Sequence, residues 1–595
     1  MEALRVAARE ALRRRDSHAI TETWLDSITI PEELNILWQD ILSHQDTTET
    51  AENLLVAQAF LKSRSSTSVS ELSESDKDTV DNLYSWSSKL ALPSAIFAAT
   101  EVESLDAEKN QVLCENKVKL ELAICVLEQL DSFVPIEKAP NVVDVIVALA
   151  SHASDQDPWT TQQSYAASRT VLEGFVARVR AESDNSFWSL IERLLTERIK
   201  PLFAKTKNPA ITEAGRKNFH PVPLPRFDAS IIDPETKPWK IQSVYATTLL
   251  SWVIAQYQSK DRSHLEAHFP LLVPPVLALI DDDSIAYKTR GCILLSQILS
   301  PIRESRSDIL QRTNLASVFE DAVRPCLLCL PSITPEDDAI KLLNVAYPAL
   351  LSLLQTNYLN ASPSGMLKPS AAHKDAYISG VTKTLRENII PSFHHISSTN
   401  RTSSSSFASF PYPRLSTLLV NQMCPLLFEL GIHTTKYLQE IIPLLYSTLS
   451  NPFGPAHPPL LVAAVAAARA VILNAHPRLW RWRGEILGAV CSCWLHAAEE
   501  EDEIAQRTAK SQSTDADQET GVAMTKLKKE LKGVVYLLRF ALENPAQPDG
   551  DAGQLEAKAV IRTELQELID ADKSLVDLLL ADIDPDDADI FGLDP

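Results

Sequence analysis

The sequence predicts an all-α protein built from stacked pairs of antiparallel helices, and three observations support this. Glycine is scarce, at 14 of 595 residues, against about 7% in an average protein, whereas hairpins and phosphate-binding loops depend on it. Apolar residues recur every three or four positions, the spacing of an amphipathic helix. The 36 prolines suit helices that are repeatedly started and stopped. One run that shows the helical spacing is Leu527, Leu531, Val534, Leu538 and Leu542.

Length and charge narrow the class further. A chain of 595 residues is several times the usual compact domain, which favours a repeat architecture. It carries 56 Lys and Arg against 78 Asp and Glu, a net charge of −22, so its field repels phosphate backbones and no nucleic-acid partner is expected.

The eight cysteines lack a disulfide-framework spacing, which indicates a reducing compartment. The N-terminus has no apolar signal region, and the longest apolar run, Leu460–Ala468, is too short to span a bilayer. We therefore expect a cytoplasmic and nuclear protein without a membrane partner.

Composition changes along the chain predict its organisation. Seven prolines between Lys200 and Lys240 exclude a continuous helix there. Because Phe203, Phe219 and Trp239 give this segment something to bury, we expect an ordered loop packed on the helices; a flexible linker is the alternative. Ser-rich or acidic stretches predict further loops, at 63–75, 360–370, 397–413, 499–520 and 546–553. The expected order is an N-terminal helical region (1–199), the Pro-rich loop (200–240), a repeat body (241–498), an acidic linker (499–520), C-terminal helices (521–580) and an acidic tail (581–595).

The segment Phe269–Ser300 has the internal pattern of a HEAT repeat. A first helix carries Pro274 and Pro275, an acidic turn follows at 281–283, and a second helix carries basic residues near its start. In such repeats an Asp of the turn caps the second helix. Since stacked pairs bury a continuous core only when several adjoin, the predicted fold class is all-α, a HEAT-like α-solenoid. Weaker copies are expected at Val323–Leu354 and Tyr437–Leu473, with a further helix pair at Leu479–Leu495.

Motifs for catalysis or cofactor binding are absent from the sequence. No Walker, dinucleotide-binding, HExxH or GxSxG string occurs. Cys326 and Cys329 lie on an apolar helix without a second ligand pair, and Cys491 and Cys493 point to different sides of a helix, so both pairs are expected to pack in the core. His394 and His395 sit beside a Ser-rich loop that cannot preorganise a nucleophile. The acidic clusters at 281–283 and 584–589 are expected to cap a helix and to be solvated. We predict neither enzyme activity nor a cofactor or metal.

Two segments suggest partner binding. His476–Trp494 concentrates Trp and Arg, the residues that dominate interface hot spots; the alternative is that the tryptophans are core and the arginines answer acidic repeat turns. The tail Ala581–Pro595 sets Ile590, Phe591 and Leu593 among aspartates, which is typical of a linear motif or of a solubilising tail. The candidate partner-binding residues are Arg478, Trp480, Arg481, Trp482, Arg483 and Trp494.

Four segments together resemble one known family. They are RIKPLFAKTKNPAITEAGRK (198–217), KPWK (237–240), LLVPPVLALIDDDSIAYKTRG (271–291) and RLWRWRGEILGAVCSCW (478–494). The AGRK loop, the Pro-Pro helix, the Asp-Asp turn and the following YKxRG resemble the Tel-two-interacting protein two (Tti-two) family. The residues that carry this motif in a structural role are Lys200, Pro201, Gly215, Arg216, Lys217, Pro274, Pro275, Asp281, Asp282, Lys288, Arg290 and Gly291.

The resemblance implies a non-catalytic scaffold subunit of the TTT complex, bound to Tti-one-like and Tel-two-like HEAT-repeat proteins. It further implies work with the ninety-kilodalton heat-shock chaperone and its R-two-TP cochaperone in maturing phosphatidylinositol-3-kinase-related kinases, including the target-of-rapamycin and DNA-damage checkpoint kinases. An importin-like or trafficking HEAT-repeat adaptor is the alternative. A main partner surface between about Tyr412 and Trp494 is expected.

Overall fold

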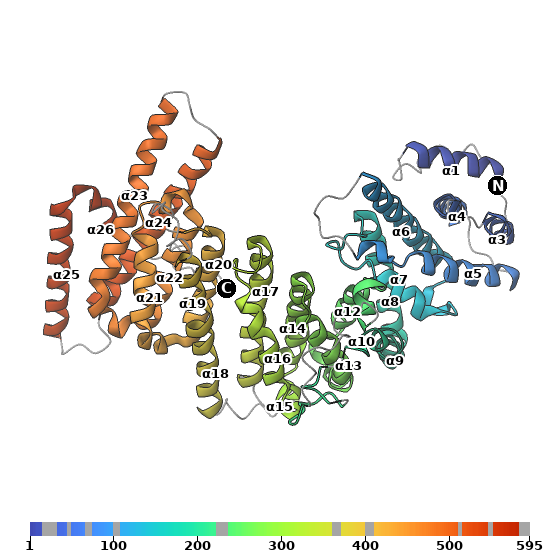
Figure 1. Cartoon of the computed structure of the whole chain (residues 1–595), viewed down its shortest axis with the longest axis horizontal. Helices are drawn as coiled ribbons and strands as arrows, with labels where there is room; N and C mark the ends of the chain where they lie inside the picture. The colour runs from blue at the N-terminus through green and yellow to red at the C-terminus, as the bar shows by residue number, and fades with distance from the viewer. Residues whose placement is uncertain are drawn as a thin grey trace. The chain divides into compact units, whose positions relative to one another are not determined.

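The fold is helical throughout (Figure 1). The computed structural model describes residues 1–14, 33–44, 49–65, 74–98, 107–206, 208–212, 214–221, 236–359, 371–398, 410–509, 515–544 and 551–581. Across these ranges the sole β feature is an isolated antiparallel bridge between Ile211 and Lys217. The predicted all-α class is therefore confirmed.

The helices form two compact units. Unit 1 comprises Met1–Leu279 and Ser300–Val318, and unit 2 comprises Ile280–Leu299 and Phe319–Pro595. The Pro-rich loop thus lies inside unit 1.

Unit 1 is a stack of paired helices. Within it α4 and α5 pack on α6, α6 packs on α8, and α5 and α8 both pack on α7. Thr161 begins α8 with a capping box, in which its hydroxyl accepts from Ser164 N and Ser164 Oγ accepts from Thr161 N. The helices are α1 (Glu2–Arg14), α3 (Leu34–Ser43), α4 (Thr50–Ser65), α5 (Glu74–Leu90), α6 (Ala107–Phe133), α7 (Val142–Ala150), α8 (Gln162–Glu182), α9 (Asp184–Arg193), α10 (Lys200–Phe203), α11 (Pro238–Ile241), α12 (Ala246–Ile254), α13 (Arg262–Ile280) and α15 (Ile309–Thr313).

The Pro-rich loop packs as predicted at its two ends. Trp239 is fully buried, and its ring stacks on Phe203 with centroids 5.3 Å apart. Pro201 and Pro238 begin the short helices α10 and α11, because proline fits the first helical turn. The prediction for Phe219 was wrong: its side chain is 67% exposed. Residues 222–235 of the loop lie outside the described ranges.

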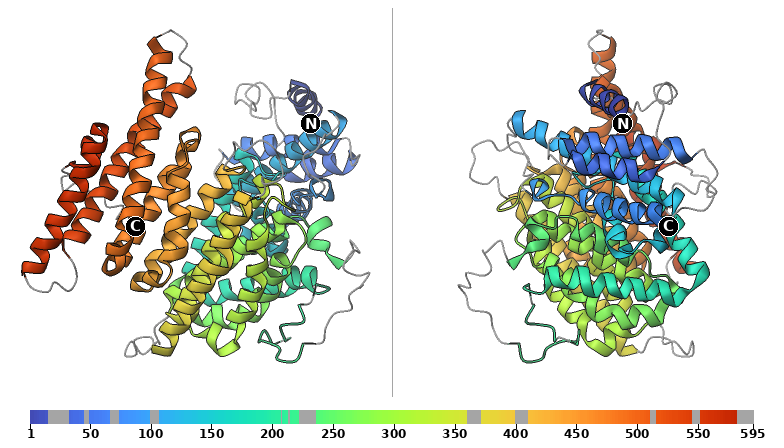
Figure 2. Two further views of the ribbon diagram at one scale, coloured as in Figure 1. Left: turned by 60° about the vertical axis from the view of Figure 1, so that its left-hand side comes forward. Right: turned by 90° about the vertical axis from the view of Figure 1, so that its right-hand side faces the viewer.

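Unit 2 is a two-layer stack. In one layer α20 packs on α22 and α22 on α24, and in the other α21 packs on α23 (Figures 1 and 2). Consecutive helices alternate in direction, so α20, α22 and α24 run the same way. Its helices are α14 (Ile285–Glu304), α16 (Leu315–Val323), η8 (Arg324–Leu328), α17 (Glu336–Tyr358), α18 (Ala371–Lys383), α19 (Ile390–Ser398), α20 (Pro413–Leu430), η10 (Gly431–Lys436), α21 (Leu438–Leu449), α22 (Pro458–Ala475), η12 (His476–Trp482), α23 (Arg483–Ala509), α24 (Asp515–Glu543), α25 (Asp551–Ala571), η13 (Lys573–Leu575) and α26 (Val576–Leu579). Residues 300–304 of α14 and 315–318 of α16 belong to unit 1.

The HEAT-type turn has the predicted Asp cap, whereas Lys288 bonds the backbone of its own repeat. The Asp282 carboxylate accepts from Ser284 N at 2.9 Å, just before α14 begins. Lys288 Nζ donates to the carbonyl oxygen of Ile280, at the end of the preceding helix, at 3.3 Å. Together the two contacts satisfy backbone groups at both helix ends. The copy predicted at Tyr437–Leu473 corresponds to α21 and α22, which pack on each other.

Two sequence predictions about unit 2 were wrong. Leu479–Leu495 is not a helix pair but the turn η12 followed by the single helix α23. The predicted linker Glu499–Thr520 is largely helical, since α23 continues to Ala509 and α24 starts at Asp515. Its Glu, Ala, Gln and Arg residues are good helix formers, and Lys528 of α24 pairs with Glu501 of α23. The low hydrophobicity of Glu499–Thr520 therefore reflects solvent-exposed helix ends rather than a loop.

Within the described ranges, four helical stretches are long and apolar enough, by length and composition, to cross a membrane: Ser259–Ile280, Glu336–Tyr358, Pro413–Lys436 and Pro458–Arg507. Between 50% and 67% of each apolar window is buried by the rest of the fold. Packing between neighbouring helices accounts for much of their hydrophobicity.

Candidate partner-binding surface

The Trp/Arg-rich segment His476–Trp494 divides into an inward part and an outward part. Arg483, at the start of α23, points inward to α25. Its Nη2 lies 2.6 Å from Glu564 Oε1 and its Nε lies 2.9 Å from Glu564 Oε2. Hydrogen bonding to Glu564 raises the pKa of Arg483. This guanidinium is committed to a contact within the chain, as the alternative interpretation of the segment expects.

Trp494 is also internal. Its side chain is 5% exposed, and its indole Nε1 donates to the carbonyl oxygen of Ser574 at 3.2 Å. The ammonium groups of Lys528 and Lys532 on α24 lie 5.0 and 5.5 Å from the ring centroid. Trp494 therefore joins α23 to α24 and to the turn before α26.

The outward part is formed by η12. Trp480 is 42% exposed, and Arg478 and Arg481 are exposed. Among the described residues neither arginine has a carboxylate partner; Arg481 lies over the ring of Trp482, 5.8 Å from its centroid. Arg483 holds Trp480 in place, since Nη1 donates to the Trp480 carbonyl at 2.6 Å and the guanidinium lies 4.6 Å from the ring centroid. Three of the predicted residues are thus presented to solvent on a braced turn.

Further exposed apolar side chains lie at the same end of neighbouring helices. Phe428 is third from the end of α20, Leu473 third from the end of α22, and Phe540 fourth from the end of α24. Their exposed fractions are 49%, 37% and 60%. Ile432, in the η10 turn after α20, is also exposed. We call this set, together with Trp480, Lys436, Arg478 and Arg481, the C-terminal edge.

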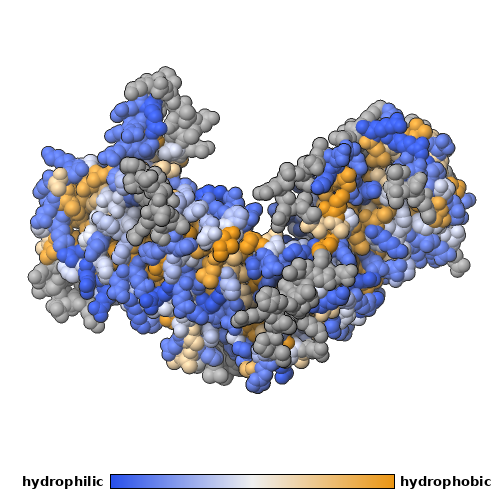
Figure 3. All heavy atoms as spheres, viewed as in Figure 1, coloured by the Kyte–Doolittle hydropathy of each residue, from blue (hydrophilic) through white to orange (hydrophobic). Residues whose placement is uncertain are grey.

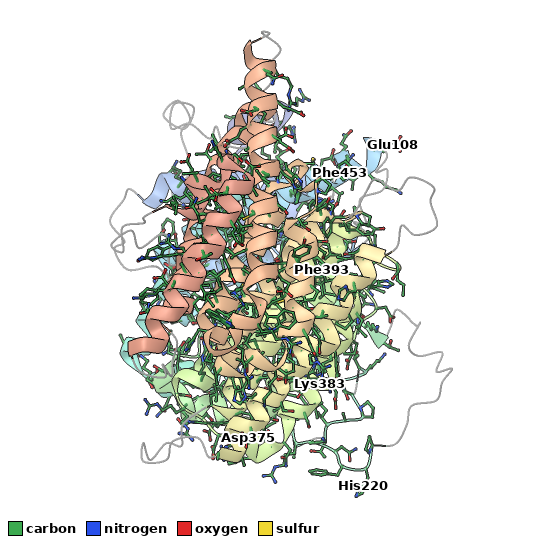
Figure 4. The ribbon with its side chains drawn as sticks, turned by 90° about the vertical axis from the view of Figure 1, so that its left-hand side faces the viewer. Glu108, His220, Asp375, Lys383, Phe393 and Phe453 are labelled. Carbon is green, nitrogen blue, oxygen red and sulfur yellow. The ribbon has the colours of Figure 1, made fainter. Side chains whose placement is uncertain are left out.

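The three helices run in the same direction in one layer, so their carboxyl ends meet at one edge. Phe453, which is labelled in Figure 4, lies before the start of α22, at the opposite end of that helix from Leu473. In Figure 3, apolar areas interrupt the hydrophilic face over the α17 and α20 part of the unit and again over α26. Sequence reasoning missed Phe428, Leu473 and Phe540, although each lies within the last turn or so of its helix.

The AGRK loop (214–217), one of the segments that resemble the family, connects two parts of unit 1 through its backbone and side-chain contacts. Gly215 has φ +63°, and a Cβ there would lie 2.6 Å from Pro270 Cα. Only glycine fits both conditions. Lys217 N donates to the Thr313 carbonyl at 3.0 Å, and Lys217 Nζ donates to Ser317 Oγ at 2.8 Å. The loop therefore holds α13 and the segment around α15 together.

Beside this loop lies a cavity of about 370 Å³. Proline, aromatic and aliphatic residues make up most of its lining, and Lys200 is the one charged residue among them. Pro274 and Pro275 have no backbone N–H, so the carbonyl oxygens of Pro270 and Leu271 lack their usual helical donors beside this cavity. The lining residues are Lys200, Phe203, Ala204, Thr206, Asn208, Ile211, Thr212, Pro270, Leu271, Pro274 and Pro275.

The remaining residues of the family motif occupy varied positions. Pro201, Arg216 and Asp281 are exposed, Arg290 is half-buried, and Gly291 is buried in α14. The structure therefore gathers the family-motif residues around two backbone features, the AGRK loop and the acidic turn, and not in one pocket.

The cysteine pairs carry no metal-site geometry. Over the described part of the chain no group of three His, Cys, Asp or Glu side chains could hold a metal ion. Burial raises the pKa of Cys491 to about 11 and that of Cys493 to about 12. A thiol that stays protonated at neutral pH is a poor ligand.

A family model decides the identity of the central region. The model described as the Tti2 family matches residues 145–456, which is more than half of the 595-residue chain. The chain belongs to the Tti2 family. The match contains the AGRK loop, the Pro-Pro helix and the acidic turn. It ends before the Trp/Arg segment, so that part of the resemblance lies outside it.

Membership of this family relates the chain to the TTT complex. No curated protein matches the chain, and no solved structure matches it.

Proposed function

We propose that this protein is a non-catalytic scaffold subunit of a TTT complex, binding Tti-one-like and Tel-two-like HEAT-repeat proteins. With them it assists the ninety-kilodalton heat-shock chaperone and R-two-TP in maturing and stabilising phosphatidylinositol-3-kinase-related kinases. The observation that carries the proposal is the family match over residues 145–456.

The geometry supports the scaffold part of this proposal in two ways. The stacked helices offer extended surfaces of the kind that repeat proteins use to bind partners. The C-terminal edge adds a braced, half-exposed tryptophan beside two exposed arginines, Arg478 and Arg481. Trp and Arg are enriched in interface hot spots.

We place the main partner surface at the C-terminal edge. Arg481 is its most informative residue, because it is exposed and makes no ion pair within the described chain. Removing its charge should change binding without changing the fold. Arg483 cannot serve the same purpose, since it is bonded to Glu564.

The test of the function is tagged capture of the full chain from cells, followed by identification of the bound proteins. Recovery of Tti-one-like and Tel-two-like proteins is the expected result. Rapid depletion of the chain should then lower the steady-state levels of several phosphatidylinositol-3-kinase-related kinases while leaving their messenger RNA unchanged. Capture of a Ran-type GTPase with cargo, and no change in kinase levels, would instead establish the importin-like alternative.

A further inference from the structure

The C-terminal edge exposes both apolar and cationic side chains. It combines five exposed large apolar side chains with three cations, Lys436, Arg478 and Arg481. Within the described residues none of these three cations has a carboxylate partner, although the chain as a whole carries a net charge of −22. The five apolar residues are Phe428, Ile432, Leu473, Trp480 and Phe540.

The apolar residues lie on helices and turns that pack against one another. Each of α20, α22 and α24 has a buried side against its neighbours and one exposed side. α20 packs on α22 and α22 packs on α24, so these exposed sides belong to neighbouring helices. Neighbouring helix axes are 8–10 Å apart, so Phe428 and Phe540 are separated by about 20 Å across the face. An extended segment of six or seven residues covers about that distance.

The chain itself supplies a segment with the matching chemistry. Residues 582–595 contain six aspartates, no Lys or Arg, and the apolar residues Ile583, Ile590, Phe591 and Leu593. A cationic edge with exposed aromatic and aliphatic side chains complements this composition in both charge and hydrophobicity.

The point at which this segment leaves the described fold is next to the edge. Arg539 Nη1 donates to the carbonyl oxygen of Leu579 at 3.1 Å, and Arg539 directly precedes Phe540 in α24. The segment therefore starts from the Phe540 end of the surface. Its 14 residues (595 − 582 + 1) reach about 45 Å when extended, enough to bring Phe591 and Leu593 to Leu473 or Phe428.

We propose that the acidic segment Asp582–Pro595 binds the C-terminal edge of the same chain and competes there with the protein partner. Phe591 and its apolar neighbours occupy the face formed by Leu473, Trp480 and Phe540, and the aspartates face Arg478, Arg481 and Lys436. The partner is admitted when the segment is displaced. The competition rests on the proposed function, whereas the binding in cis does not.

The proposal predicts that the segment lowers the affinity of the partner without abolishing binding. A segment tethered to the same chain as its binding site acts at an effective concentration of the order of millimolar. If the free peptide binds with a Kd of about 10 to 100 μM, the tethered segment weakens any competitor by about 10- to 100-fold. The interaction weakens as salt rises, because exposed charges are screened.

The first experiment measures binding of a fluorescein-labelled peptide, Asp582–Pro595, to the intact chain and to the chain ending at Ala581, by fluorescence anisotropy. We expect the shortened chain to bind the peptide, and the intact chain to bind it at least tenfold more weakly. Equal affinities for the two chains would overturn the proposal, as would no binding to the shortened chain at several hundred micromolar peptide.

Two matched variants locate the site. In the shortened chain Arg481→Glu should weaken peptide binding at least fivefold without changing Tm. Lys341→Glu makes the same charge change at an exposed residue near the start of α17 and should leave peptide binding unchanged. A peptide carrying Phe591→Ala and Leu593→Ala should bind at least fivefold more weakly. Equal losses of peptide affinity in Arg481→Glu and Lys341→Glu would show that the peptide responds to the net charge of the chain and not to the C-terminal edge.

A separate arm distinguishes this inference from the proposed function. The shortened chain should capture its Tti-one-like partner at least tenfold more tightly than the intact chain. If the peptide competes in cis but no partner is captured by either chain, the proposed function fails and the segment binding stands. If a partner binds both chains equally, the competition is wrong.

Discussion

Arg483 and Glu564 form a two-point ion pair that joins the start of α23 to α25 across 81 residues of sequence, with Nη2–Oε1 and Nε–Oε2 distances of 2.6 and 2.9 Å. Because a planar guanidinium and a carboxylate match in this geometry, the pair fixes the position of α25. The same arginine supports Trp480 through its carbonyl and ring. Arg483 therefore both stabilises the fold, through Glu564, and positions Trp480 of the candidate partner-binding surface.

Arg483→Glu should therefore destabilise the C-terminal helices. It replaces an attraction with a repulsion between two carboxylates, and since both side chains are partly exposed the expected loss is about 1 to 2 kcal/mol. Increased hydrogen exchange in α25 and a lower Tm would report it. The double variant Arg483→Glu with Glu564→Arg should recover at least half of the loss, whereas Arg481→Glu should leave Tm unchanged. A full loss in the double variant would mean that the orientation of the pair matters more than its charge.

Gly215→Ala should destabilise unit 1 by about 2 kcal/mol or more. The residue has φ +63°, and the added Cβ would meet the backbone of Pro270 at 2.6 Å, so both strain and overlap oppose the change. Chemical denaturation gives the free energy of unfolding. Gly484→Ala is the matched control, because nothing lies within 4 Å of its Cβ position in α23. It should be neutral or stabilising by up to about 1 kcal/mol.

Asp282→Ala should cost about 1 kcal/mol by removing the acceptor for Ser284 N at the start of α14. Asp283, the next residue, is exposed and makes no such bond, so Asp283→Ala should have little effect. Equal thermal shifts for the two variants would show that Asp282 acts through the overall charge of the turn and not as a cap.

His152 should make unit 1 less stable in mild acid. Its ring is fully buried, Nε2 donates to the Ala91 carbonyl at 3.0 Å, and burial lowers the pKa of His152 to about 4 from 6.5. The folded state thus keeps the ring neutral, and between pH 6.5 and 4 the unfolded state binds the extra proton. The stability is complete above pH 6.5 and is lost as pH falls toward 4, by up to roughly 3 kcal/mol.

His152→Gln removes this titration. Its free energy of unfolding at pH 7 should be lower than that of the natural chain, and its decline between pH 6.5 and 4.5 should be shallower by about 1 kcal/mol per pH unit. Urea denaturation at several pH values measures both slopes. Parallel slopes would contradict a neutral buried ring.

The sequence predicted those features that depend on local patterns. Helical periodicity fixed the class, and the capping role of Asp282 followed from its place in a helix turn. The acidic stretch Glu499–Thr520 failed because polarity alone does not separate a loop from an exposed helix whose Glu, Arg and Lys side chains pair with one another. The prediction that Phe219 is buried was wrong because the positions of the prolines do not determine which aromatic side chain of the loop points into the fold.

The candidate surface was predictable in composition but not in detail. The Trp/Arg content of residues 476–494 indicated a special role, yet the division between the inward Arg483 and Trp494 and the outward Trp480 and Arg481 depends on α25 and η13. Those elements lie some 80 residues further along the chain, so no local pattern could reveal the pairing.

The most direct test of the central claim is co-precipitation of a Tti-one-like partner with Arg481→Glu and with Lys341→Glu in the full chain, with circular dichroism on the same preparations. Both variants should keep native helicity and Tm. The account predicts that Arg481→Glu loses at least tenfold in partner recovery while Lys341→Glu binds as the natural chain does. Full partner recovery by folded Arg481→Glu would contradict a partner surface at the C-terminal edge.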